Sequence, residues 1–286
     1  MRFRYSTGRK IFLLANAVFL ALLVITMFVP FWNALVISLS SALGSMHTGI
    51  TLWPRHFSFA GYRDLFTIFD FWRPLENSLI VTFVGTFAHV LLSALAGYAL
   101  AQPAFPGRRV ITLIIMVTMM IPFQAIMIPF YITMEQVGLL NTLTSLILVG
   151  FVSGFSILLM RNFFLNIPRE LNEAAEIDGA SQFRIFWQIY LPLSKAGLAT
   201  VSLFEFVGRW NNLLAVILLI NNSNRDTLQV ALYSIINNQA STSNPTMITP
   251  NVQMAGIILA MLPLILLYPF IQRYFVQGIF LGANKD

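Results

Sequence analysis

The sequence contains 286 residues, of which 57% are hydrophobic and only 10% are charged. Because an ordinary soluble domain has about 25% charged residues, this composition indicates an integral membrane protein. Its net charge of +6 then bears on orientation in the membrane rather than on nucleic acid. The absence of cysteine excludes disulfides, thiolate zinc sites and cysteine nucleophiles.

Six apolar segments are long enough to cross a bilayer as helices, for which about 20 residues are needed. In chain order they are 11–31, 79–101, 110–132, 143–160, 196–220 and 255–277. The first resembles a signal peptide, but its apolar part exceeds the usual length of about 7 to 15 residues, so we expect it to span the membrane. The sequence therefore predicts an all-α, polytopic membrane protein with six transmembrane helices, in which residues 1–286 form one domain.

The distribution of Lys and Arg predicts which side of the membrane each loop faces. With the N-terminus inside, twelve basic residues lie on the cytoplasmic side, namely Arg2, Arg4, Arg9, Lys10, Arg108, Arg109, Arg161, Arg169, Arg184, Lys195, Arg273 and Lys285. Four lie outside, namely Arg55, Arg63, Arg73 and Arg225, and Arg209 falls within the fifth segment. This asymmetry predicts that both termini are cytoplasmic.

The loop between the fourth and fifth segments, residues 166–192, is then cytoplasmic, and it carries the amphipathic stretch "IPRELNEAAEIDGASQFRIFWQIYLP". Pro168 suits the first turn of a helix, and Gly179 offers a left-handed stop. A second short helix is expected to begin at Ser181 and to end at Pro192. The pattern predicts a helix-turn-helix, and by itself it fits a docking element, a helix lying flat on lipid or a packed loop.

The residues of this loop closely resemble the signature of the membrane subunits of binding-protein-dependent ABC importers. In that family the signature runs Glu-Ala-Ala, three residues, Gly, nine residues, Ile, one residue, Leu-Pro. Every position is matched here, by Glu173, Ala174, Ala175, Gly179, Ile189, Leu191 and Pro192. Much of the remaining chain resembles the carbohydrate-uptake branch, particularly the smaller maltose-type membrane subunit, through segments such as "MIPFQAIMIPFYITMEQVGLLNT" and "RWNNLLAVILLI". The resemblance is weakest over residues 235–253, which we expect to form a chain-specific outer loop.

The resemblance implies a multi-pass protein of the bacterial cytoplasmic membrane that works with a second membrane subunit, two ATPase subunits and an extracytoplasmic solute-binding protein. ATP and Mg would be bound by the ATPases, so this chain would hold no cofactor. Its signature loop would dock in a groove of one ATPase, where Glu173 would meet a basic group and Phe183 and Phe186 would fill the groove. The residues thereby assigned to ATPase coupling are Glu173, Ala174, Ala175, Asp178, Gly179, Phe183, Phe186, Leu191 and Pro192.

The sequence contains no catalytic motif of its own. It lacks a phosphate-binding G-x-x-x-x-G-K-S/T loop and an H-E-x-x-H pair, and its three histidines, His47, His56 and His89, are too scattered to suggest a metal site. We therefore expect a non-catalytic subunit. His89 lies in the second apolar segment, where we interpret it as a hydrogen-bonded packing residue rather than a proton relay.

Polar residues inside the apolar segments are candidates for the translocation pathway. In the fifth segment Ser202, Glu205, Arg209 and Asn212 share one helix face. Charges at membrane depth generally face a bundle interior or an aqueous cavity, so this face is the leading candidate. Glu205 and Arg209 could equally neutralise each other as a structural i,i+4 pair, and both interpretations stay open.

The second and third segments carry two further patterns. In the third, Pro122 and Pro129 predict a kinked helix near Gln124, and kinks of this kind recur around transport pathways, although an ordinary packing kink explains them as well. In the second, small and polar residues form one stripe that we interpret as a helix-packing surface. The stripe consists of Ser78, Thr82, Gly85, His89, Ser93 and Gly97.

The predicted function is import of a carbohydrate, most simply an oligosaccharide, driven by ATP hydrolysis on the partner ATPases. An acidic saccharide or a polyol phosphate would use the same scaffold. An ATP-independent secondary transporter would also explain six apolar segments but gives the signature loop no purpose, and a membrane-embedded enzyme would need a catalytic constellation, which the sequence lacks.

Overall fold

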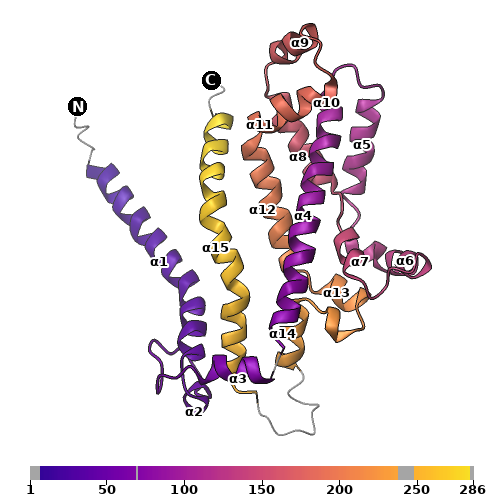
Figure 1. The fold of residues 1–286 in the computed structure, drawn as a ribbon. Coiled ribbons are helices and arrows are strands. Elements are labelled where there is room, and N and C mark those ends of the chain that lie inside the picture. Colours follow the sequence, from indigo (N-terminus) through magenta and orange to yellow (C-terminus); the bar gives the residue numbers. More distant parts are fainter. Residues whose placement is uncertain (1–6, 69, 238–247, 284–286) are drawn as a thin grey trace. The chain divides into compact units, whose positions relative to one another are not determined.

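The computed structural model describes residues 7–68, 70–237 and 248–283 of the chain (Figure 1). Regular structure in these residues is helical, with one isolated β-bridge between Ser40 and Phe57, which confirms the all-α class. The residues group into two compact units, Met1–Asp70 with Leu232–Leu262 and Phe71–Ala231 with Pro263–Asp286, and each is described by itself. The predicted outer loop, residues 235–253, includes 238–247, which lie outside the described residues.

The first unit is built on one long apolar helix and a short polar contact beside it. Its elements are α1 (Thr7–Ser38), α2 (Ala42–Ser45), α3 (Ala60–Ile68), the end of α14 (Leu228–Asn237) and the first part of α15 (Pro250–Ala283). Asn251 is fully buried, donates from Nδ2 to the Ser40 carbonyl at 3.3 Å and accepts from Ser45 Oγ at 3.4 Å. This buried amide fixes the start of α15 against the chain that follows α1.

The second unit is organised around the long helix α4 (Trp72–Ala101). After it come α5 (Arg108–Thr118), α6 (Phe123–Gln136), α7 (Leu143–Leu148), α8 (Gly154–Leu165), α9 (Arg169–Ile177), α10 (Gln182–Ile185), the π-helix η1 (Phe186–Tyr190), α11 (Leu191–Leu193), α12 (Lys195–Trp210), α13 (Leu214–Leu219) and the short η2 (Ser223–Arg225). Helices α8 and α12 make the most extensive contacts with α4, so α4 is the central helix of this unit (Figure 1).

The stripe of small and polar residues along α4 is the surface on which α8 and α12 pack. All six of its predicted members are buried, which confirms the packing interpretation. A Cβ on Gly97 would lie 2.8 Å from the Arg161 nitrogen and 2.9 Å from Met160 Cβ, and one on Gly85 would lie 2.5 Å from the Arg209 guanidinium. Glycine at these two positions therefore lets α8 and the Arg209 side chain approach the α4 backbone.

The six predicted apolar segments are all largely helical. Within the described residues, three continuous helices are long and apolar enough to cross a membrane: α1, α4 and Pro250–Pro269 of α15. Segment 110–132 is divided into α5 and α6, whose axes differ by 97°. Segment 143–160 is divided between α7 and α8, and segment 196–220 between α12 and α13. The number of membrane crossings stays a prediction.

Each interruption has a local cause. Pro122 lies just before α6 with an extended backbone, so the predicted kink is a break there, whereas Pro129 lies inside α6 without ending it. The chain turns between α7 and α8 at Gly150, whose φ of 63° lies in the left-handed region that favours glycine. Asn212 Oδ1 accepts a hydrogen bond from the Ala215 nitrogen at 3.2 Å and so starts α13.

The loop before α14 contains a carboxyl group that folding places in a less polar environment. Burial raises the pKa of Asp226 above its ordinary value. A raised folded-state pKa means that the folded state binds protons more readily than the unfolded state, so stability falls as pH rises through the folded pKa. We therefore expect Asp226→Asn to raise the thermal midpoint of the detergent-solubilised protein at neutral pH, with a gain that shrinks as pH is lowered toward 4.

The control is Asp178→Asn, which makes the same change of charge at an exposed side chain. The effect is measured as the thermal midpoint of both variants and the parent, monitored by size-exclusion chromatography at several pH values. An equal gain in both variants at every pH would contradict the assignment to burial of Asp226.

Candidate coupling segment and buried polar network

Helix α9 and the turn after it form as the sequence predicts. The helix begins directly after Pro168 and ends at Ile177. Gly179 has φ of 77°, its nitrogen donates to the Glu176 carbonyl at 3.0 Å, and the Ala180 nitrogen donates to the Ala175 carbonyl at 2.9 Å. This left-handed cap satisfies the last carbonyls of the helix. A Cβ on Gly179 would meet nothing within 4 Å, so backbone conformation rather than crowding favours glycine here.

The second helical stretch begins at Ser181 as predicted but does not end at Pro192. Ser181 Oγ accepts from the Arg184 nitrogen and starts α10. The chain continues through η1 and α11, which contains Pro192, and the stretch is interrupted at Ser194, with φ of −103° and ψ of 26°. The predicted end at Pro192 was wrong because the π turn widens the backbone hydrogen-bonding pattern, as in the Leu191 nitrogen to Phe186 carbonyl contact, and so accommodates a residue without an N–H.

The exposed residues of this stretch define what a partner could contact. We call residues 166–192 the coupling segment. Of the residues predicted for coupling, Glu173, Ala174, Asp178, Gly179, Phe183 and Pro192 are exposed, and Ala175 and Leu191 are half-buried. Ile177, which the sequence analysis did not select, is 86% exposed. An apolar residue this exposed in an otherwise polar helix is a further candidate contact for a partner. Its place in the sequence between two acidic residues, Glu176 and Asp178, is the feature that could have identified it.

The two predicted groove-filling phenylalanines have different environments. Phe183 is 65% exposed and packs edge-on against Trp187, with ring centroids 5.9 Å apart. Phe186 is 1% exposed and packs against Tyr98 and Phe164, at 5.3 Å and 6.4 Å between centroids. A partner cannot reach Phe186 in this conformation, because its ring belongs to the core of the chain itself. Phe183 is the exposed aromatic residue of the predicted pair.

A chain of hydrogen bonds joins the coupling segment to the central helix. Glu176 Oε1 accepts from Asn172 Nδ2 at 2.8 Å and from Gln182 Nε2 at 2.7 Å. Gln182 Oε1 in turn accepts from the Tyr98 hydroxyl of α4 at 2.6 Å. The turn between α9 and α10 is thus tied to α4, so the two would move together. Sequence reasoning missed Tyr98 because 84 residues separate it from Gln182.

Arg209 lies at the centre of a buried polar network. Its side chain donates to the carbonyls of Leu146, Ile147 and Gly150 at 3.3, 3.0 and 3.2 Å, and its Nε lies 2.6 Å from Glu205 Oε1. These carbonyls lie in the last turn of α7 and just after it, where no intrahelical partner is available. Arg209 is 8% exposed, so it joins the end of α7 to α12 and neutralises Glu205.

His89 extends the same network from α4. Its Nδ1 donates to the Gly150 carbonyl at 2.8 Å, because a carbonyl oxygen only accepts, and its Nε2 lies 2.8 Å from Ser156 Oγ and 3.5 Å from Glu205 Oε2. The ring is fully buried. The interpretation of His89 as a hydrogen-bonded packing residue is confirmed, and its hydrogen-bond partners come from α8 and the turn before it.

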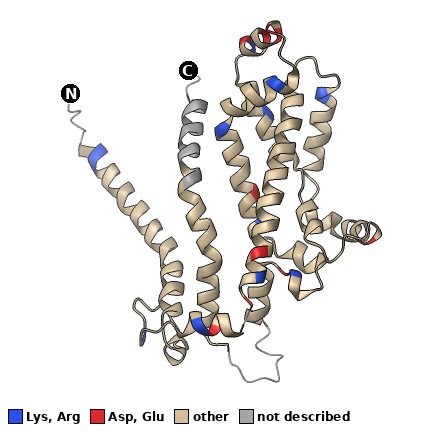
Figure 2. Cartoon of the chain, in the orientation of Figure 1, with Lys and Arg blue, Asp and Glu red and all other residues tan. Residues whose placement is uncertain are grey.

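The predicted pathway residues are therefore dispersed. Arg209 and Asn212 make contacts within the chain, Ser202 and Glu205 are half-buried, and the structural pairing of Glu205 with Arg209 is confirmed. Pro122, Gln124 and Pro129 are exposed on and beside α6. Figure 2 shows charged residues on α9 and the helix ends near it, whereas the bodies of α4, α8 and α12 carry few charges. The assignment of these residues to a pathway stays a prediction.

Comparison with known proteins agrees with the signature loop. Residues 89–281 match the family described as binding-protein-dependent transport system inner membrane component. The chain is 32% identical over 283 residues to the protein LplC of Bacillus subtilis, covering 96% of this chain and 95% of LplC. It is 34% identical over 277 residues to the polygalacturonan/rhamnogalacturonan transport system permease protein YtcP of the same organism, covering 93% and 96%.

Among solved structures, a bacterial ABC transporter involved in the import of the acidic polysaccharide alginate contains a chain that is 32% identical to this one. The two superpose with a TM-score of 0.86, covering 95% of this chain and 99% of that one. The family match spans well over half of the chain and includes both the coupling segment and the Arg209 network. The chain belongs to the family of inner membrane components of binding-protein-dependent transport systems.

Proposed function

We propose that this chain is one of two membrane subunits of an ABC importer and that its coupling segment docks on a cytoplasmic ATPase. The observation that carries the proposal is the coupling segment itself. Glu173, Ile177 and Phe183 are exposed in this segment, and its base packs in the core through Phe186. A segment with an exposed tip and a fixed base can receive force from a partner and pass it to the chain.

The hydrogen bonds from Glu176 through Gln182 to Tyr98 support a specific route for that force. When the ATPases close on ATP and Mg, movement of the docked segment would pull on α4, on which α8 and α12 pack. The two membrane subunits would then alternate between outward-facing and inward-facing states. This chain would itself hold no nucleotide and would act as a non-catalytic subunit.

The proposal also covers how the helices of this chain are arranged in the membrane. We propose six crossings with both termini cytoplasmic, in which α5 with α6, α7 with α8, and α12 with α13 each form one interrupted crossing. Interrupted helices are tolerated at membrane depth where protein or water satisfies the freed backbone groups. The contacts of Arg209 with three carbonyls in the last turn of α7 and just after it support such a role at one break.

The transported solute is proposed to be a carbohydrate delivered by an extracytoplasmic binding protein. Relatives with nearly full coverage support this: YtcP is named for polygalacturonan and rhamnogalacturonan, and the transporter of solved structure for alginate. An oligosaccharide is the simplest solute, and an acidic saccharide or a polyol phosphate would use the same scaffold. The solute is identified by purifying the binding protein encoded beside this chain and by measuring which saccharides it binds.

Affinity purification from native membranes in mild detergent tests the docking. The wild-type chain is expected to bring down an ATPase and a second membrane subunit, identified by mass spectrometry. Glu173→Arg, which reverses an exposed charge, and Gly179→Asp, which strains the left-handed turn, are expected to reduce the recovered ATPase at least tenfold and to leave the second membrane subunit bound. Glu135→Arg is the matched control, because it makes the same charge reversal on exposed α6.

Recovery of ATPase with both variants at the wild-type level would show that the coupling segment does not dock there. Wild-type chain without any ATPase, under conditions that preserve other ABC importers, would contradict the motor itself. ATP-independent transport would then be the function to test, by uptake into proteoliposomes in the presence and absence of ATP.

A further inference from the structure

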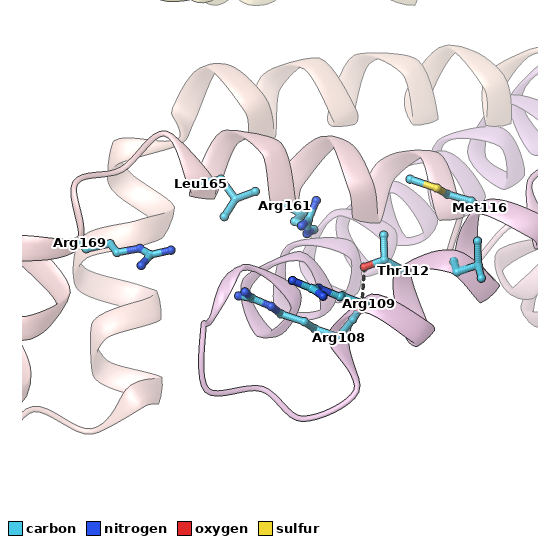
Figure 3. Close-up of a pocket in the computed structure, with 8 residues that line it drawn as sticks. Arg108, Arg109, Thr112, Met116, Arg161, Leu165 and Arg169 are labelled. Atoms are coloured by element: carbon cyan, nitrogen blue, oxygen red, sulfur yellow. Dashed lines mark hydrogen bonds between the residues drawn. The ribbon is translucent and has the colours of Figure 1, made fainter.

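A pocket between α5 and α8 gathers four arginine side chains. Its volume is about 380 Å³, and Arg108, Arg109, Arg161 and Arg169 lie on its wall. Figure 3 shows that their guanidinium groups approach the same space from α5, from α8 and from the start of α9. All four are among the basic residues that predict orientation in the membrane. Orientation requires only that they lie on one side of the membrane, whereas folding brings them into one pocket.

The four positive charges lack an acidic partner in the part of the chain that the structure describes. Arg108 donates to the Gln102 carbonyl at 3.3 Å and Arg161 to the Leu100 carbonyl at 3.4 Å, both at the end of α4. Neither Arg109 nor Arg169 has a side-chain hydrogen bond or ion pair within the described ranges, and both are exposed. Four cations around one space repel one another, and an anion bound between them would relieve that repulsion.

Apart from Thr112, whose hydroxyl donates to the Arg108 carbonyl at 2.7 Å, the rest of the pocket wall is apolar. Leu113, Met116 and Leu165 line it, and Leu113 is 62% exposed. The whole of α5 has no buried residue, so its apolar side chains are open to lipid or to a partner. A small hydrophilic anion would use only the arginine end of this pocket, whereas a molecule with a charged head and an apolar tail would cover both parts.

We propose that this pocket binds an anionic phospholipid, with its phosphate between the arginine side chains and an acyl chain along Leu113 and Met116. Basic pockets between transmembrane helices on the cytoplasmic side bind lipid head groups of this kind. Arg109 and Arg169 supply charges without a side-chain hydrogen bond or ion pair among the described residues, and Arg108 and Arg161 are held in position by carbonyls at the end of α4. The bound lipid would fix α5 against α8, which otherwise make few contacts.

Native mass spectrometry of the full-length chain, purified in mild detergent with the proteins that accompany it, tests this proposal. The probes are dioleoyl phosphatidylglycerol and, for comparison, dioleoyl phosphatidylcholine, each titrated into the detergent solution. We expect phosphatidylglycerol to bind at least tenfold more tightly than phosphatidylcholine. Arg109→Gln combined with Arg169→Gln should weaken phosphatidylglycerol binding about tenfold, whereas Arg109→Lys with Arg169→Lys should retain most of it.

The matched control combines Lys10→Gln with Lys195→Gln, which removes the same charge from exposed residues that do not line the pocket. Equal weakening in the control and in the pocket variant would reduce the effect to general electrostatics and overturn the proposal. Strong competition by glycerol phosphate or inorganic phosphate would assign the pocket to a free anion, and competition by an oligogalacturonate would assign it to a solute. Either result would also overturn the lipid assignment. None of these outcomes depends on ATPase docking, so the two proposals fail separately.

Discussion

Replacing Arg209 by leucine is expected to destabilise the chain by roughly 3 kcal/mol or more, the cost of breaking a buried ion pair by removing one partner. The change leaves Glu205 without its counter-ion, which Arg209 Nε approaches at 2.6 Å. It also removes the donors to the carbonyls of Leu146, Ile147 and Gly150. Arg209→Lys should be intermediate, because an ammonium cannot span the same set of acceptors.

The measurement is the thermal midpoint and the monodisperse yield of the detergent-solubilised protein. Arg225→Leu, which removes the same charge from an exposed residue, should change both by little. Adding Glu205→Leu to Arg209→Leu should recover part of the loss, since the double variant no longer buries an unpaired carboxylate. If Arg209→Leu folds as well as the parent, the network is not a structural element, and a pathway role for Arg209 gains support.

Replacing Gly97 by valine is expected to separate α4 from α8 and to destabilise the chain by about 1–3 kcal/mol, the range for overpacking a close contact. The added Cβ would lie 2.8 Å from the Arg161 nitrogen, and a backbone atom of a packed helix cannot move aside as the end of a flexible side chain can. The same separation would shift Tyr98 and with it the hydrogen bond to Gln182, so ATP-driven transport should fall as well.

Gly208→Val is the control for Gly97→Val, because a Cβ on Gly208 in α12 meets nothing within 4 Å. The thermal midpoint of each variant is compared with that of the parent, so that the change at Gly208 measures helix propensity without crowding. Equal losses at the two positions would show that propensity, not the close approach of α4 and α8, determines the effect.

Local features of the coupling segment were predictable because they depend on neighbours in sequence. Gly179 and Ser181 mark the turn between the two helical stretches through their own backbone and side-chain chemistry, and both occupy their predicted positions. The end predicted at Pro192 was wrong because a π turn relieves the constraint that proline imposes on an α-helix. Phe183 and Phe186 could not be separated in advance, since both are aromatic residues and only the contacts with Tyr98 and Phe164 bury Phe186.

The sequence by itself determined the all-α class, the apolar segments and the signature that places this chain in its family. Composition and short-range spacing carry that information, and apolar length and turn chemistry need no tertiary contact to be recognised. Only the tertiary structure decided that Arg209 caps α7, that His89 joins Glu205 and Ser156, and that four arginines share one pocket. These contacts of Arg209 and His89 join residues 62 to 116 positions apart. Periodicity predicts the helix face on which a side chain lies but not the partner that it meets there.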